Sequence, residues 1–103
     1  MEIEKKAMSA VAAMMRALAN ETRLRILYEL RESSKTWTEL MFELKLNPKS
    51  LRDHLDYLRK SGLVEKREPV GFGLTDAAKE FMESNLPQLI STVKQAVEIA
   101  ESS

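Results

Sequence analysis

Residues 18–67 read LANETRLRILYELRESSKTWTELMFELKLNPKSLRDHLDYLRKSGLVEKR, and this stretch decides the fold. Three apolar repeats with helical spacing follow one another in it. Each repeat begins at a residue that caps helices well: Asn20, Thr36 and Asn47. The helices that begin at Thr36 and Asn47 are separated by a turn of only a few residues, which is the spacing of a helix-turn-helix.

The helix ends carry further signals. Thr36 and Glu39 match a capping box, in which the two side chains reciprocally satisfy free backbone N–H groups. Pro48 follows Asn47 at the first helical position, where its missing N–H costs nothing. Gly62 predicts a left-handed cap after the last helix. We expect helices over about 3–19, 20–32, 36–45 and 48–61.

Apolar periodicity predicts the buried side of each helix. Leu51, Leu55 and Leu58 form a narrow stripe on the helix expected at 48–61. In the helix before the helix-turn-helix, the leucines and Ile26 are expected to be buried. Its arginines are expected to face solvent: Arg23, Arg25 and Arg31.

A small β-hairpin follows the predicted helices. Residues 63–67 indicate a strand, the segment from Pro69 to Gly73 indicates a tight turn, and Phe72 with Leu74 begins a return strand. Thr75 then caps a last helical region, which Pro87 is expected to break or kink. The predicted fold is mainly α with a two-stranded β wing. Its expected parts are an N-terminal helix at 1–19, a winged helix-turn-helix at 20–75, and a C-terminal dimerisation region at 76–103.

Composition narrows the possible functions. A chain of 103 residues with 44% hydrophobic and 31% charged residues fits one globular domain. It has no cysteine and one histidine, which excludes disulfides, cysteine zinc sites and a histidine-pair metal site within one chain. We expect no metal and no cofactor. No apolar run approaches the ~20 residues of a membrane span, and no signal peptide is evident, so a cytoplasmic protein without membrane contact is expected.

Charge is distributed unevenly although the net charge is zero. Residues 48–67 hold six basic and three acidic side chains, a net charge of +3, whereas residues 68–103 hold two basic and six acidic ones, a net charge of −4. Such an asymmetry orients a protein on DNA without a high overall pI.

Three segments resemble one family of regulators. LANETRLRIL is similar to the second helix of ArsR-like proteins, ELMFELKLNPKSLRDHLDYLRKSGLVEKR to their helix-turn-helix and first wing strand, and GLTDAAKEF to the wing-to-helix junction of several winged-helix regulators. The resemblance covers roughly residues 11–83, with some MarR-like character after the wing. It implies a winged helix-turn-helix fold and a homodimer in which terminal helices pair. It also implies that two recognition helices enter successive major grooves of double-stranded DNA. The cysteine or histidine–carboxylate clusters of metal-sensing relatives are missing.

Candidate DNA contacts gather at the helix-turn-helix and the first strand. Lys49, Ser50 and Arg52 are expected to reach base edges near the start of the recognition helix. Asp53 either accepts from cytosine or pairs with Lys49 or with the hydroxyl of Tyr57. The basic side chains Arg59, Lys60, Lys66 and Arg67 are expected to contact the phosphate backbone, and Thr36 and Thr38 are candidate donors to it, although capping explains Thr36 equally well. Capping is the first interpretation for Asn47, and partly buried packing is the first interpretation for His54. DNA contact is the alternative for both, as it is for Tyr57.

Apolar faces at both ends of the chain exceed what so small a domain buries. They predict a dimer interface made of Met8, Val11, Met15, Leu86, Leu89, Ile90, Val93, Ala96, Val97 and Ala100. An unknown small-molecule or protein effector could act on such a protein, and the space between the first and last helices is one place for a pocket.

The sequence therefore predicts a homodimeric transcriptional regulator that binds double-stranded DNA in a sequence-directed way. Repression by occlusion of the promoter is its expected mode of action. A winged-helix module for protein–protein assembly and a sequence-neutral chromosomal protein stay open as alternatives. Catalysis has no support, because the chain shows no nucleophile–base pair, metal cluster or glycine-rich phosphate loop.

Overall fold

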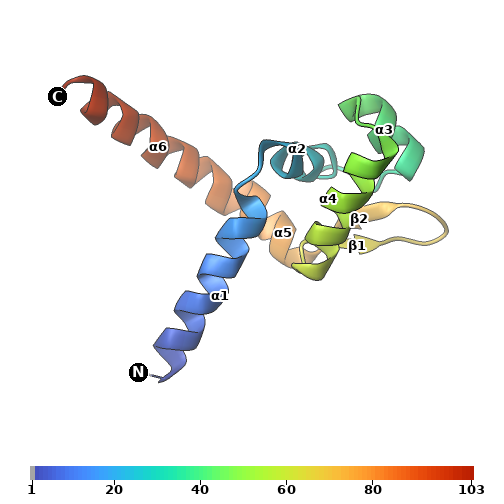
Figure 1. Cartoon of the computed structure of the whole chain (residues 1–103), viewed down its shortest axis with the longest axis horizontal. Coiled ribbons are helices and arrows are strands. Elements are labelled where there is room, and N and C mark those ends of the chain that lie inside the picture. Colours follow the sequence, from blue (N-terminus) through green and yellow to red (C-terminus); the bar gives the residue numbers. More distant parts are fainter. Residues whose placement is uncertain (1) are drawn as a thin grey trace.

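The computed structural model describes residues 2–103, with side chains from Glu4 onward. Its centre is formed by three short helices, a β-hairpin and a fourth short helix, and two longer helices project from it as arms with diverging free ends (Figure 1). The elements in chain order are α1 (Glu2–Leu18), α2 (Glu21–Glu29), α3 (Trp37–Leu44), α4 (Pro48–Lys60), β1 (Val64–Lys66), β2 (Phe72–Leu74), α5 (Asp76–Glu80), the π-helical turn η1 (Phe81–Asn85) and α6 (Leu86–Glu101).

The predicted helix caps are confirmed by hydrogen bonds. The Asn20 side chain accepts from the Arg23 N–H at 3.0 Å, and the Asn47 side chain accepts from the Ser50 N–H at 2.8 Å. Thr36 and Glu39 form the predicted capping box, with bonds of 3.1 and 2.9 Å. Gly62 has the expected positive φ of 76° directly after α4. These caps fix where α2, α3 and α4 begin, and so fix the helix-turn-helix.

One hydrophobic core holds the centre together. The stripe Leu51, Leu55 and Leu58 on α4 is buried, as predicted. It packs with aliphatic side chains from α2, α3, both strands and the residues next to them: Ile26, Leu27, Leu30, Leu40, Leu44, Leu63, Val64 and Leu74. Burying one side of α4 leaves its opposite side in solvent over the full length of the helix.

The wing is a two-stranded antiparallel sheet in which Val64 pairs with Leu74 and Lys66 with Phe72. Lys35 adds an isolated bridge on the outer side of Phe72, with backbone bonds of 3.0 and 2.8 Å. The first strand is shorter than the predicted 63–67. The Leu63 N–H donates to Leu58 O at the end of α4, and the Arg67 N–H closes the turn onto Gly71 O.

The break or kink predicted at Pro87 takes the form of a π-helical turn: the helical region continues, but its regular α-helix is interrupted directly before Leu86. The chain passes from α5 into α6 through η1, in which the Leu86 N–H donates to Phe81 O, five residues back. Pro87 is the second residue of α6 and lies in its first turn, where a missing N–H is tolerated. The predicted break is therefore a widened turn.

The two arms keep most of their apolar side chains in solvent. α6 contains no buried residue, and within the described part of α1 only Ala17 is buried. Met8 is 71% exposed and Val93 is 51% exposed. Leu86 was predicted to lie in the dimer interface, but it is half-buried against the core of its own chain. None of the described helices is both long and apolar enough to cross a membrane.

Candidate nucleic-acid interface

The solvent side of α4 is polar throughout. Opposite its buried leucines it exposes Lys49, Arg52, Asp53, Asp56, Arg59 and Lys60. Four of these side chains are basic and two are acidic, so the exposed side carries a net positive charge. An exposed basic helix that follows a tight turn is the arrangement by which a helix-turn-helix presents its second helix to the major groove.

Lys49 and Asp53 are paired at the start of this surface. The Lys49 Nζ lies 3.1 Å from Asp53 Oδ2, one helical turn along, and the Lys49 side chain is 86% exposed. The predicted i, i+4 pair is thus confirmed, and Tyr57 is not its partner. An exposed ion pair is worth little free energy, so either side chain can exchange it for a partner on a ligand.

Arg52 extends toward α3. Its guanidinium carbon lies 6.0 Å from the centroid of the Trp37 ring, at the outer limit of a cation–π contact. Trp37 is half-buried against the core. Thr38 is exposed in the first turn of α3, whereas the side-chain oxygens of Thr36 and Asn47 accept the capping bonds described above.

Arg23 is a residue that sequence reasoning placed wrongly. Instead of facing solvent, its side chain donates to Ala17 O at 2.6 Å and to Arg16 O at 2.9 Å. Its guanidinium carbon also lies 4.2 Å from the centroid of the Tyr57 ring. Helical periodicity locates a Cα atom but does not say where a long side chain reaches, so no sequence signal marked these contacts.

His54 is partly buried, as expected. Burial lowers the pKa of its imidazole below the ordinary value of 6.5, the positive charge of Arg23 lowers it further, and Asp53 opposes both effects. A neutral imidazole beside the apolar stripe is suited to packing and not to holding a phosphate.

The basic residues that follow on the chain divide into two groups. Arg59, Lys60 and Lys66 are exposed. Arg67 is engaged within the wing instead, since it donates to Glu65 Oε2 and to Leu74 O, both at 2.6 Å.

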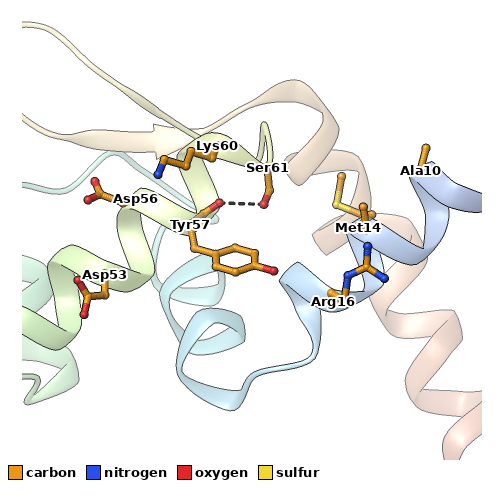
Figure 2. A pocket seen from close by; sticks show the side chains of 9 residues that line it. Ala10, Met14, Arg16, Asp53, Asp56, Tyr57, Lys60 and Ser61 are labelled. Carbon is orange, nitrogen blue, oxygen red and sulfur yellow. Dashed lines mark hydrogen bonds between the residues drawn. The ribbon is translucent and has the colours of Figure 1, made fainter.

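A groove of about 700 Å³ separates α4 from α1 (Figure 2). The Tyr57 hydroxyl points across it toward α1, and Asp53, Asp56 and Lys60 lie along its α4 side. A second cavity, of about 430 Å³, lies between α2, α3 and α6. Neither cavity lies between α1 and α6, where the sequence suggested a ligand pocket. The free ends of these two helices diverge (Figure 1). In the described part of the chain, no cluster of histidines and carboxylates has the makeup of a metal site.

Comparison with known proteins agrees with this geometry. The family model of the bacterial regulatory proteins of the arsR family matches residues 20–66, from the cap of α2 to the end of β1. The structure of reduced HlyU from Vibrio cholerae superposes with a TM-score of 0.72 at 31% identity, covering 81% of this chain and 92% of that one. The chain belongs to the ArsR family. It is therefore a transcriptional regulator with a winged helix-turn-helix, and not an enzyme.

Other relatives and solved structures are similar to this chain as well. The transcriptional activator HlyU from Vibrio cholerae is 40% identical over 67 residues, which are 65% of this chain and 61% of the length of that protein. The transcriptional repressor BigR from Xylella fastidiosa has a TM-score of 0.72 at 26% identity, covering 88% and 93% of the two chains. A homodimeric winged helix-turn-helix DNA-binding domain from Mycobacterium bovis has a TM-score of 0.73 at 22% identity, covering 86% and 84%. The predicted fold class is confirmed.

Proposed function

We propose that the protein is a homodimer that binds double-stranded DNA and places the start of α4 of each protomer in the major groove. The observation that carries this proposal is the exposed, polar side of α4 directly after the helix-turn-helix turn, with Lys49 extended into solvent. An assembly module would present an apolar patch there or bury that side, and α4 does neither.

Lys49, Ser50 and Arg52 are the residues assigned to base edges. Lysine and arginine donate to guanine O6 and N7, and serine donates to either base or phosphate. Asp53 lies between them and Lys49 is already its partner. Reading DNA therefore requires Lys49 to leave Asp53 or Asp53 to accept from a cytosine amino group.

Phosphate contacts are assigned to exposed donors around α4: Thr38, Arg59, Lys60 and Lys66. The other residues of the predicted set have partners in their own chain, which favours structural roles for them. Thr36 and Asn47 accept capping bonds, and Tyr57 contacts Arg23. His54 is partly buried, and Arg67 donates within the wing.

The exposed apolar sides of the two arms support the proposed dimer. Exposed apolar side chains on α1 and α6 supply the two surfaces: Met8, Val11, Met15, Leu89, Ile90, Val93 and Val97, with the small residues Ala96 and Ala100 between those of α6. The similar domain from Mycobacterium bovis is a homodimer. Two recognition helices would then meet half-sites about 34 Å apart on one side of the duplex.

The direction of regulation is a separate question, because HlyU is described as an activator and BigR as a repressor. Repression by occlusion stays our prediction. In run-off transcription from a bound promoter, added protein should lower the yield of transcript, and a rise in yield would contradict repression without affecting the DNA-binding proposal.

Fluorescence anisotropy with labelled genomic-fragment and random duplexes, at several salt concentrations, tests DNA binding. The informative variant is Lys49→Ala/Arg52→Ala. Its matched control is Lys79→Ala/Lys94→Ala, which removes the same charge from exposed positions on α5 and α6.

We expect wild type and the control to prefer a subset of fragments and to lose affinity steeply with salt. The α4 variant should lose that preference. Equal affinity for every duplex would favour the sequence-neutral chromosomal protein. No binding at low salt, by protein shown to be folded, would favour the assembly module.

A further inference from the structure

The cavity between α2, the end of α3 and the start of α6 has an apolar interior. It has a volume of about 430 Å³. Five apolar side chains from these three regions and from η1 line it: Leu24, Leu44, Met82, Leu86 and Ile90. Leu44 and Met82 are buried, whereas Leu24 and Leu86 are half-buried and therefore open to a bound molecule. An apolar hollow of this size suits the body of a small organic molecule.

The rim of the cavity is acidic. Glu21, Glu29 and Glu43 lie on it, and Arg25 is its single basic residue. Arg25 is turned toward the backbone and donates to Leu44 O at 3.4 Å. Lys35, outside the cavity, lies 3.0 Å from Glu43 and offsets one carboxylate. Glu21 and Glu29 form no ion pair within the described part of the chain.

One of these carboxylates is sensitive to charge placed beside it. A hydrogen bond to Glu43 raises the pKa of Glu29 above its ordinary value, and burial and the negative charge of Glu43 act in the same direction. A positive charge beside Glu29 would favour its ionised form. The electrostatics of the rim therefore favour a positive ligand and oppose a negative one.

The π-helical turn gives a second, independent indication. η1 contributes Met82 to the cavity, and Leu86 follows it directly at the start of α6. π-helical turns are rare, and they occur frequently at functional sites. Here the widened turn is the element that forms one wall of the hollow.

We propose that this cavity binds a hydrophobic organic cation, with the apolar body of the ligand against Leu24, Leu44 and Leu86 and its positive charge beside Glu21 and Glu29. A bound molecule would touch both the end of α3, where the helix-turn-helix turn begins, and the start of the α6 arm. Only its effect on transcription would rest on the proposed DNA binding, since the site itself does not involve α4.

Isothermal titration calorimetry tests the site without DNA, so that a failure of the DNA-binding proposal leaves the result intact. The probe is tetraphenylphosphonium, and tetraphenylborate in sodium buffer is its control of nearly equal shape and opposite charge. The variant Glu21→Gln/Glu29→Gln removes two rim carboxylates and leaves the Glu43–Lys35 pair in place. Glu80→Gln/Glu98→Gln is the matched control, because both carboxylates are exposed and lie outside the cavity.

We expect one cation per chain to bind to wild type and to Glu80→Gln/Glu98→Gln, with no binding of the anion. The rim variant should bind several-fold more weakly at low salt, with the difference shrinking as salt is added. Equal binding of both ions, or an unchanged rim variant, would overturn the proposal. Absence of binding in the folded dimer would overturn it too. That holds even if Val93→Glu/Val97→Glu, a variant designed to separate the two chains, binds the cation, because a second copy of the chain would then cover the cavity.

Discussion

The guanidinium of Arg23 lies over the ring of Tyr57, 4.2 Å from its centroid, while its nitrogens donate to the last carbonyls of α1. One side chain of α2 thus contacts both an arm that is expected to pair with a second protomer and the helix that is expected to read DNA. The basic end of Arg23 also suits the C-terminal end of α1, where carbonyl oxygens lack helical partners.

Arg23→Ala should therefore destabilise the protein by about 2 kcal/mol, because charge-assisted bonds to two carbonyls and the stacking on Tyr57 are lost together. Urea denaturation followed by circular dichroism measures the change. Arg59→Ala, which removes an exposed arginine from α4, is the control and should cost less than about 0.5 kcal/mol. Equal costs for the two variants would mean that the Arg23 contacts contribute nothing.

Helix caps supply a second stability prediction. Asn47→Ala removes the acceptor for the Ser50 N–H and should cost about 1 kcal/mol. Thr36→Ala breaks the capping box and should cost a similar amount, about 1 kcal/mol. Thr38→Ala, at an exposed position one residue into α3, serves as the comparison. If all three variants unfold at the wild-type urea concentration, the caps do not limit stability.

Val93→Glu/Val97→Glu should convert the dimer into a monomer, because two charges would be placed in the middle of the apolar side of α6. Light scattering at micromolar concentration gives the mass. Gln88→Glu/Gln95→Glu adds the same charge to the opposite side of α6 and should remain dimeric. A wild-type protein with a monomeric mass would refute the dimer itself, and a dimeric valine variant would place the interface elsewhere.

Asp53→Asn should raise affinity for random duplexes several-fold at low salt. The change removes a negative charge facing the phosphates and also releases Lys49 from its ion pair. Asp56→Asn is the matched variant, because it removes an equal exposed charge from α4 but breaks no ion pair with Lys49, so its gain should be smaller. Lower affinity of Asp53→Asn in anisotropy titrations would instead indicate that Asp53 itself accepts from a base.

His54 predicts a pH dependence. Because folding lowers the pKa of this imidazole, the unfolded chain binds the proton more tightly. The contribution of His54 to the free energy of unfolding should thus be fully present above the ordinary pKa of 6.5. It should be lost as the pH drops through 6.5 toward the lower pKa of the folded state. Urea denaturation of wild type and His54→Gln at about pH 7.5 and about pH 5.5 measures this, and the wild type should lose more stability. An equal loss in both proteins would assign the dependence to other groups.

Much of the fold could be predicted because its signals are local. Caps at Asn20, Thr36 and Asn47, the apolar stripe of α4 and the glycine after it each depend on a few neighbouring residues. The hairpin was also predicted, although the backbone bonds at Leu63 and Arg67 shorten its first strand.

Contacts between distant segments could not be predicted in the same way. The reach of Arg23 to Tyr57 depends on how α2 and α4 pack, and the half-burial of Leu86 depends on where η1 turns the chain. The Lys49–Asp53 pair was among the alternatives predicted for Asp53, because its spacing is that of one helical turn. The acidic rim of the cavity combines residues of α2 and α3, so no single sequence window contains it.

The π-helical turn before α6 has a geometric consequence for the dimer. Its backbone bond spans one residue more than an α-helical turn, so it holds the equivalent of one inserted residue. Each residue rotates a helix by about 100°. In the proposed dimer, removing that residue would rotate the apolar side of α6 away from the partner and change the angle between the two α4 helices. The relative phase of the two DNA half-sites would thus depend partly on the length of one turn, far from the α4 side chains that are proposed to contact bases.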